Sequence, residues 1–388
     1  MIHTSITIIL ALSLLIWSSP FIAKILRIPT PAVEIILGSL VAYFGFIGHN
    51  EYFDLVAEVG FLYLMFLAGM EVDLKQITQS PRHVIRRSVL FLGLMILISV
   101  STGFLFDLNP IVIISMPLIS IGLLASLSKT YGKTQPWIHL AMIAGVLGEI
   151  LSIAALTIFD AASTTGFNIA LVAKIGYLAL FLLVIYLLYR SLHLLFWWFP
   201  ELKSILIPKL DTSDQDVRLS MALFFIMIAV MLYLKLELAL GAFIAGVAIS
   251  AFFHHEKKLE EKMSSLGFGF LVPLFFIHVG ASFDLESLKV DGVVSGALLI
   301  TALMILSRIL AAVTLKPVSG AKNALLVALA LSMPLTLLVA VATIGYETKL
   351  LDLLSYYQLI LASIFEILVA MITIKILRGK RVNESTPS

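Results

Sequence analysis

The chain alternates between long apolar runs and short polar, charged or Pro/Gly-rich breaks from one end to the other. Apolar runs of about 20 residues are typical of helices that cross a bilayer. The first run lacks a basic segment before it and a small-residue cleavage site after it, so we interpret it as a helix and not as a signal peptide. The pattern predicts an all-α membrane protein with about thirteen transmembrane helices, over residues 4–24, 31–48, 53–70, 84–106, 109–128, 137–161, 169–190, 217–235, 237–254, 267–285, 291–315, 321–345 and 354–377.

The Lys and Arg residues indicate how these helices are oriented. When the N-terminus is placed outside, about 21 of the 26 Lys and Arg residues fall in loops on the inner side, where basic residues concentrate. The outer loops hold only Lys174, Lys235, Lys289 and Lys349, and Arg308 lies inside a span. We therefore predict an outside N-terminus and a cytoplasmic C-terminus.

The composition excludes several classes of protein. The 388 residues are 60% hydrophobic and 13% charged, with a mean hydropathy of +1.07, which is far from the composition of a soluble domain. A net charge of +2 is too small to indicate a nucleic-acid partner, and the absence of cysteine excludes disulfides and thiolate metal sites. No phosphate-binding loop, nucleophile triad or metal-ligand cluster is recognisable, so we expect no enzyme activity, no cofactor and no metal site.

A polar linker near residues 200–216 divides the chain. Residues 4–161 begin outside, residues 169–199 form a linking helix, and residues 217–377 begin inside. Two halves of about six helices each therefore have inverted topology, a common plan for secondary transporters whose discontinuous helices cross near the ion site. We predict a single transmembrane domain over residues 1–388 that ends in a disordered tail, 379–388.

Three charged residues fall near the middle of predicted spans, where each costs about 2.5 to 3.5 kcal/mol or more. Glu149 lies in the sixth span beside Gly145 and Gly148, Arg308 in the eleventh, and Glu366 in the thirteenth. The glycines leave space and exposed backbone beside Glu149, which favours a binding function, although Gly-x-x-Gly is also typical of close helix packing. Arg308 and Glu366 are either functional charges or a structural pair that joins two helices, and the sequence leaves both interpretations open.

Prolines interrupt two other spans at equivalent places in the two halves. Pro117 lies near Ser120 and Gly122 in the fifth span, and Pro334 precedes Thr336 in the twelfth. A proline frees a carbonyl and removes a donor, and such backbone is tolerated at this depth only inside protein or beside a water-filled cavity. Each proline alone is compatible with a simple kink, but paired breaks in two inverted halves indicate the ion site of a transporter.

Glu34 and His278 are weaker candidates for a gate or a pH sensor. Glu34 lies early in the second span, near the predicted inner face, where a capping or interfacial charge is equally compatible with the sequence. His278 lies nearer mid-membrane, and histidine is the side chain that most readily changes charge near neutral pH. A hydrogen-bonded core histidine explains its position at least as well.

Several segments resemble, in their order and in their amino-acid sequence, the monovalent cation/proton antiporter superfamily (the sodium/hydrogen exchanger family), on its Kef-type and NapA-like branch. They span nearly the whole chain and read IPTPAVEIILGSL, VAEVGFLYLMFLAGMEVDL, LALGAFIAGVAIS and PLFFIHVGASFDL. The last two are close to diagnostic when they occur together. The resemblance implies the NhaA- and NapA-like antiporter fold with discontinuous crossing helices, as a homodimer in the inner membrane of a bacterium.

In such antiporters an acidic pair in the sixth span carries the ion, and a basic residue of the eleventh span supports the core. The resemblance places the pair on Gly148 and Glu149 and the basic position on Arg308. The first acid is therefore missing and the second is Glu instead of Asp, which leaves cation selectivity and stoichiometry open. Kef-type proteins usually continue into a cytoplasmic nucleotide-binding domain, and we expect no regulation by bound nucleotide within this polypeptide.

The residues and the resemblance together predict a secondary transporter that exchanges Na⁺ or K⁺ for protons, electroneutrally and by alternating access. The cation and the proton compete for Glu149, and Ser120 and Thr336 complete a hard-cation site. Two alternatives stay open, a gated and channel-like potassium-efflux pathway, and a transport-inactive membrane scaffold or sensor. The expected partners are monovalent cations, protons, the lipid bilayer and a second copy of the chain, and a separate regulatory subunit is left open.

Overall fold

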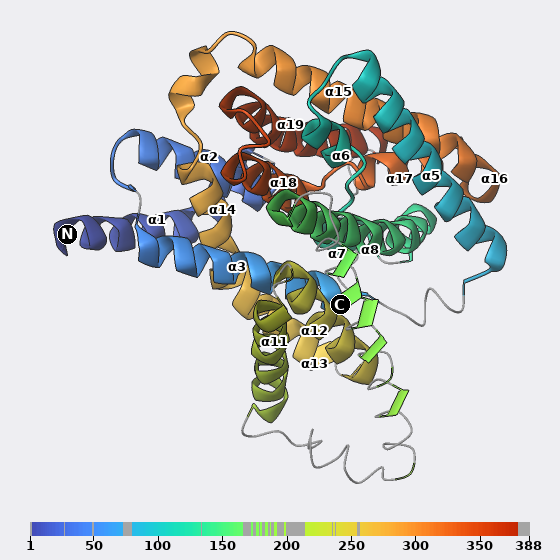
Figure 1. Cartoon of the computed structure of the whole chain (residues 1–388), viewed down its shortest axis with the longest axis horizontal. Helices are drawn as coiled ribbons and strands as arrows, with labels where there is room; N and C mark the ends of the chain where they lie inside the picture. Colours follow the sequence, from blue (N-terminus) through green and yellow to red (C-terminus); the bar gives the residue numbers. More distant parts are fainter. Residues whose placement is uncertain are drawn as a thin grey trace, which may run out of the picture. The chain divides into compact units, whose positions relative to one another are not determined.

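The computed structural model is built from helices throughout the part of the chain that it describes (Figure 1). It describes residues 2–165 apart from 27, 49, 73–79 and 133, residues 214–378 apart from 235, 237 and 254–256, and scattered positions between 172 and 198. The predicted linking helix, 169–199, lies mostly outside the described residues, and the predicted tail, 379–388, lies wholly outside them.

Helices occupy the predicted apolar ranges on both sides of the linker. Before it they are α1 (Ile2–Leu26), α2 (Thr30–Tyr43), α3 (Glu51–Met70), α5 (Arg82–Leu105), α6 (Pro110–Ser115), α7 (Gly122–Tyr131) and α8 (Pro136–Thr165). After it they are α11 (Gln215–Leu234), α12 (Leu238–Phe253), α13 (Lys257–Leu266), the π-helix η1 (Gly267–Leu271), α14 (Val272–Ala281), the 3₁₀ helix η2 (Leu285–Lys289), α15 (Val293–Ala311), η3 (Ala312–Leu315), α16 (Lys316–Ser319), α17 (Ala321–Ala330), α18 (Leu335–Glu347) and α19 (Leu353–Arg378).

The lengths and hydropathy of these helices make the chain an integral membrane protein. Among the described residues, eight helices are long and apolar enough to cross a membrane, and α17 with α18, bent by 43° at their junction, would make a ninth. Two further apolar helices, α2 and the part of α12 over Leu238–Ala251, are shorter than a full span. The all-α membrane class is therefore confirmed, whereas the count of thirteen and the inverted repeat stay predictions.

Asparagine caps determine where two of these helices begin. The Asn50 side chain accepts hydrogen bonds from the backbone N–H groups of Tyr52 and Phe53 at the start of α3. The Asn109 side chain accepts one from Ile111 at the start of α6, whose first residue is Pro110. An N-cap acceptor followed by proline is a strong helix start, so α6 begins at a defined place. The helix is only six residues long.

The chain folds into two compact units, and each draws residues from both predicted halves. The first unit contains Met1–Ile16, Phe46–Thr78 and Ile153–His278, and the second contains Trp17–Gly45, Gln79–Ser152 and Val279–Ser388. Within the first unit, α12 packs along α3 and α11. Within the second unit, α15 packs against α19 and α5, and α18 packs against α19 and α6.

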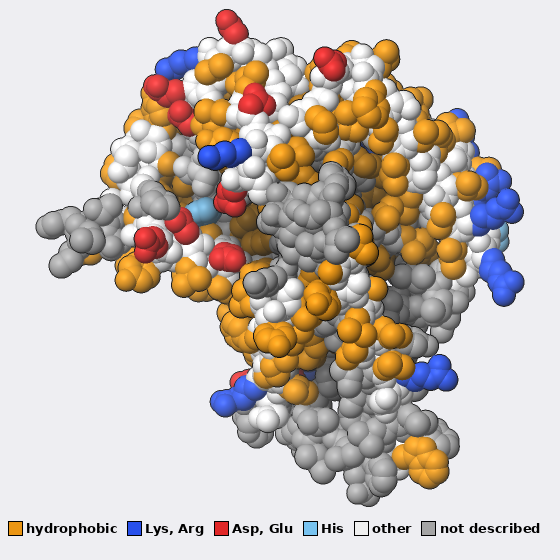
Figure 2. Space-filling view, viewed as in Figure 1, with side chains coloured by type: hydrophobic (Ala, Val, Ile, Leu, Met, Phe, Trp, Pro, Cys, Tyr) orange, Lys and Arg blue, Asp and Glu red, His pale blue; other side chains and the backbone are white. Residues whose placement is uncertain are grey.

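Large apolar side chains lie exposed on many of these helices, as contact with lipid requires. Hydrophobic side chains cover much of the face in Figure 2. Trp17 on α1 and Leu97 on α5 are more than half exposed, with exposed fractions of 68% and 62%. In water such surfaces would favour aggregation, but in a bilayer they face hydrocarbon.

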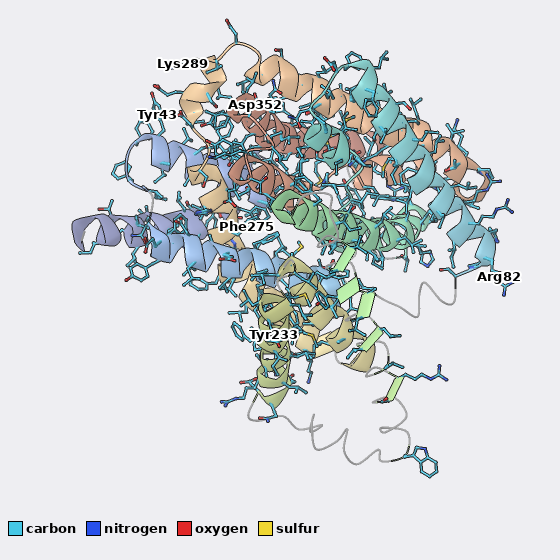
Figure 3. The ribbon with its side chains drawn as sticks, in the orientation of Figure 1. Tyr43, Arg82, Tyr233, Phe275, Lys289 and Asp352 are labelled. Atoms are coloured by element: carbon cyan, nitrogen blue, oxygen red, sulfur yellow. The ribbon has the colours of Figure 1, made fainter. Side chains whose placement is uncertain are left out.

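Figure 3 labels three side chains of the second unit that bear on the predicted orientation in the membrane. Arg82, at the start of α5, lies far from Tyr43 and Lys289, which are the last residues of α2 and η2. The Lys and Arg pattern predicts that Arg82 faces the cytoplasm and that Lys289 faces the outside. The separation is compatible with that orientation, which stays a prediction.

Glycines bring α3 and α12 into close contact in the first unit. A Cβ atom at Gly246 would overlap the backbone carbonyl oxygen of Phe66, and a Cβ atom at Gly69 would overlap that of Phe243. Small residues at a helix crossing let two backbones approach, which is a main source of packing energy inside a bilayer. The glycines of the LALGAFIAGVAIS segment therefore have a packing role.

We predict that Gly246→Ala lowers the free energy of unfolding by about 1 to 3 kcal/mol, because the new methyl group must displace backbone atoms of α3. Gly93→Ala in α5 is the matched control, since a Cβ atom at Gly93 meets no other atom within 4 Å. Thermal melting of both variants in detergent measures the difference. A Gly246→Ala protein as stable as the Gly93→Ala protein would contradict the close contact.

Candidate ion-binding site

The two interrupted spans bring their breaks together in the second unit. The break between α6 and α7 contains Pro117 and ends at Gly122, the first residue of α7. The break between α17 and α18 ends at Pro334, directly before α18. Across the two breaks, the hydroxyl oxygens of Ser120 and Thr336 lie 3.3 Å apart. Residues more than 200 positions apart in the sequence thus form one polar group inside the protein.

Glu149 of α8 is fully buried and faces the first break. Its Oε2 accepts a hydrogen bond of 2.6 Å from the backbone N–H of Ile121, at the start of α7. The N-terminus of a helix stabilises negative charge, so this contact favours the ionised carboxylate. Its Oε1 is buried and has no hydrogen-bond partner among the described residues. Glu149 therefore has one oxygen held by the protein and one available to a ligand.

Two glycines let α8 approach the first break closely. A Cβ atom at Gly145 would lie 2.8 Å from the side chain of Ile121, and one at Gly148 would lie 2.6 Å from Cδ1 of Ile119. The Gly-x-x-Gly spacing thus serves close packing as well as leaving room beside Glu149. The Ile119 side chain occupies the place that a side chain at position 148 would take, so the neighbour of Glu149 on that side is apolar.

Arg308 is fully buried in α15 and connects three elements. Its Nη1 donates hydrogen bonds of 3.0 Å to Oε1 of Glu366 in α19 and to the carbonyl oxygen of Met304. Its Nη2 donates a bond of 2.6 Å to the carbonyl oxygen of Leu118, inside the first break. The structure brings the two residues of the predicted charge pair together, and the same guanidinium also satisfies a carbonyl that the helix break has freed.

Ser152, Ile119 and the carbonyl of Leu118 belong to this group, and the sequence interpretation missed all three. The Ser152 hydroxyl accepts a hydrogen bond of 2.9 Å from the backbone N–H of Ile119 and donates one of 2.7 Å to the carbonyl oxygen of Gly148. The signal for Ser152 was its position three residues after Glu149, on the same helix face. A backbone carbonyl such as that of Leu118 leaves no signal in a sequence.

Glu34 and His278 make contacts of their own. Glu34 is buried in α2, where its Oε1 accepts a hydrogen bond of 3.1 Å from the Ser19 hydroxyl. His278, in the first unit, is partly exposed and its Nε2 lies 2.9 Å from Oδ1 of Asp54 in α3. Phe53 packs edge-on against the His278 ring. Asp54 is a partner that the sequence interpretation did not find, and the gate and sensor roles stay predictions.

The ligands that this site offers are oxygen atoms. Oε1 of Glu149 and the hydroxyls of Ser120 and Thr336 are the hard donors that alkali cations prefer. Among the residues that the structure describes, no group of three or more His, Asp or Glu side chains could hold a resident metal ion. Glu149, Ser120 and Thr336 are the predicted cation- and proton-binding residues, and that role stays a prediction.

Comparison with known families identifies the group to which this arrangement belongs. The profile of the family described as "Sodium/hydrogen exchanger, transmembrane" matches residues 8–378, which is nearly the whole chain. The chain belongs to the sodium/hydrogen exchanger family. The resemblance to the sodium/hydrogen exchanger family is therefore confirmed, and this is a family of transporters, not of enzymes.

Two relatives and one solved structure show how far the similarity extends. YjbQ of Bacillus subtilis (strain 168), named as a Na(+)/H(+) antiporter, is 25% identical over 377 residues, which are 91% of this chain and 60% of YjbQ. Na(+)/H(+) antiporter 3 of Methanocaldococcus jannaschii is 25% identical over 329 residues, which are 79% of this chain and 76% of that protein. The chain thus spans about 60% of the length of YjbQ.

The solved structure of the sodium proton antiporter MjNhaP1 from Methanocaldococcus jannaschii has the same fold as this chain. The two match with a TM-score of 0.65 and 18% sequence identity, over 94% of this chain and 96% of the other. At this level of identity the match concerns the fold. It shows that the helices described above share the fold of that solved structure.

We predict that Arg308→Ala lowers the free energy of unfolding by about 3 to 5 kcal/mol, because it leaves the buried Glu366 carboxylate without its partner. Glu366→Gln in the same protein removes the stranded charge and should restore part of the loss. The restoration is incomplete because the Leu118 carbonyl still lacks its donor.

A double-mutant cycle, measured by unfolding in detergent, gives the coupling energy of this pair. The exposed pair Lys289 and Glu286, 3.4 Å apart, is the control and should show little coupling. Strictly additive effects of the Arg308 and Glu366 substitutions would show that the two side chains do not depend on each other.

Proposed function

We propose that this exchanger is a secondary transporter that moves a monovalent cation in exchange for protons across a membrane. The observation that supports it best is the state of Glu149, which is fully buried, with one oxygen on the Ile121 amide and the other without a partner among the described residues. A buried carboxylate without a fixed cationic partner must bind a cation or a proton to be neutral. Those are the two substrates of an exchanger.

Competition between the two substrates provides the coupling. The cation binds Oε1 of Glu149 with help from the Ser120 and Thr336 hydroxyls, and a proton on the same carboxyl group removes the charge that attracts the cation. Glu149 is therefore occupied by one or the other, and the loaded site is exposed to the two sides of the membrane in turn. About thirteen helices in two inverted repeats would provide the two symmetric access states.

The exchange is electroneutral because, of the two glutamates in the network around the first break, only Glu149 lacks a cationic partner among the described residues. Glu366, the other glutamate of that network, faces the Arg308 guanidinium and is neutralised by it. The position next to Glu149 is Gly148, whose side-chain space is filled by Ile119. One proton then replaces one monovalent cation, and no net charge moves.

The wider setting follows from the charge pattern and from the relatives. We place the exchanger in the cytoplasmic membrane of a bacterium, as a homodimer, with its N-terminus outside and its C-terminus in the cytoplasm. Two relatives are named for Na⁺/H⁺ exchange, and the oxygen ligands of the site suit both Na⁺ and K⁺. In liposomes with an imposed pH gradient, adding Na⁺, K⁺, Li⁺ or NH₄⁺ separately identifies the cation that collapses the gradient.

We predict that Glu149→Gln abolishes exchange, since the amide keeps the size of the side chain but can neither take up a proton nor carry the charge that attracts a cation. Glu149→Asp should keep part of the activity with a changed cation KM. The Asp side chain is one methylene shorter, so its carboxylate cannot stay in place for both the Ile121 amide and the cation. The measurement is cation-dependent proton movement in liposomes. Glu286→Gln, the same substitution at an exposed acid, is the control and should exchange like the wild type.

We also predict that the exchange rate in tight liposomes does not change with an imposed membrane potential. Each charge that crosses a membrane potential of 100 mV gains or loses about 2.3 kcal/mol, so a cycle that moves net charge must respond steeply. Valinomycin and K⁺ gradients set the potential while a pH-sensitive dye reports the rate. A steep response would show net charge movement, and a potential-driven current without proton exchange would favour the channel-like alternative.

A further inference from the structure

Ser152 of α8 makes a contact that its neighbours on the helix do not explain. A serine inside a helix often bonds only to the carbonyl four residues earlier, as Ser220 does in α11 with the carbonyl of Asp216. Ser152 makes that bond to Gly148 and in addition accepts the backbone N–H of Ile119, from a different element. The side chain is 4% exposed, so water does not replace either bond. Its hydroxyl therefore joins α8 to the helix break.

The break is held to α8 at two amides, one on each side of Ser120. The N–H of Ile119 is bound by Ser152 at 2.9 Å, and the N–H of Ile121 is bound by Glu149 at 2.6 Å. Two fixed peptide groups leave Ser120 little freedom, and its hydroxyl lies 3.3 Å from that of Thr336. The position of one proposed cation ligand thus depends on both amide contacts.

The two contacts respond differently when the ligand of Glu149 changes. The bond from Ile121 ends on a carboxylate, and a cation or a proton on that carboxylate withdraws negative charge from the accepting oxygen. The bond from Ile119 ends on a neutral hydroxyl that neither substrate binds. The contact at Ser152 therefore persists through the exchange cycle, while the contact at Glu149 weakens and strengthens with each turnover.

We propose that Ser152 is a positioning residue of the ion site, which keeps the break between α6 and α7 on α8 while Glu149 exchanges its ligand. This inference rests on the function proposed above. Through the Ile119 amide it sets the place of the Ser120 hydroxyl and keeps the Ile119 side chain against Gly148, next to Glu149. Ser152 does not itself touch the transported ion.

The test compares Ser152→Ala with Ser220→Ala in the full-length chain reconstituted into liposomes. Both substitutions remove a buried hydroxyl that bonds its own helix, but only the first leaves an amide of another element without a partner. We expect Ser152→Ala to raise the cation KM about five- to ten-fold, with the maximal rate within about two-fold of wild type, because the Ser120 ligand is displaced while Glu149 and the exchange step are kept. Ser220→Ala should leave both parameters unchanged.

Two further measurements separate positioning from a loss of folding. Ser152→Thr restores the hydroxyl and should return the KM to within about two-fold of the wild-type value. The pH dependence of the maximal rate should be the same in the wild type and in Ser152→Ala, because Glu149 still takes up the proton. Size-exclusion chromatography and thermal melting confirm that each variant is folded.

The outcomes separate this inference from the function on which it rests. If the wild type collapses no pH gradient with any of the four cations, the proposed function fails. If the wild type exchanges but a folded Ser152→Ala protein has the KM of Ser220→Ala, Ser152 has no positioning role. A Thr variant as impaired as the Ala variant overturns the inference too, since the hydroxyl would then not be the cause.

Discussion

A helix that breaks inside a membrane frees peptide groups that lipid cannot satisfy, so the protein must provide their partners. In this protein, side chains from α8 and α15 provide them for the break between α6 and α7. Arg308 donates a hydrogen bond to the Leu118 carbonyl. Ser152 accepts one from the amide of Ile119, and Glu149 accepts one from the amide of Ile121. The same hydrogen bonds that stabilise the break also position the residues of the candidate ion site. Scaffold and site are therefore one hydrogen-bonded network.

The two buried glutamates of this network differ because of what faces them. Glu366 meets a guanidinium at 3.0 Å, which balances its charge without any transported ion. Among the described residues, Glu149 bonds only to a backbone amide, which stabilises the carboxylate but does not neutralise it. Depth in the membrane is therefore not what separates a glutamate with a fixed counter-ion from the one to which we assign transport. The identity of the fixed partner decides it, and Arg308 is committed to Glu366 and to the break.

The sequence was informative where a residue is expensive to bury. Glu149, Arg308, Pro117 and Pro334 stood out because each is costly in a span, and the structure places them in or beside the two breaks. Ser152 was missed because serine is an ordinary residue in a helix, and only its distance from the Ile119 amide gives it a role.

Features that depend on long-range packing were equally out of reach of the sequence. The two compact units each combine segments from both halves of the chain, and a hydropathy pattern contains no information about such pairing. The π-helix at Gly267–Leu271 lies inside an apolar run that predicts an unbroken helix. Likewise, the acidic residue Glu34 was recognisable as unusual, but its hydroxyl partner, 15 positions away, was not.

The number of acidic side chains in the candidate site depends on the packing of Gly148 against Ile119 as well as on Glu149. A second acid beside Glu149 would need room for its side chain, and here Cδ1 of Ile119 lies 2.6 Å from where the Cβ of such a residue would stand at Gly148. An acid at position 148 would therefore have to displace Ile119, whose amide is held by Ser152. The lone carboxylate is thus built into the packing between α8 and the break. A change to a two-acid site would require the break itself to be repacked, because the glycine and the isoleucine fit each other.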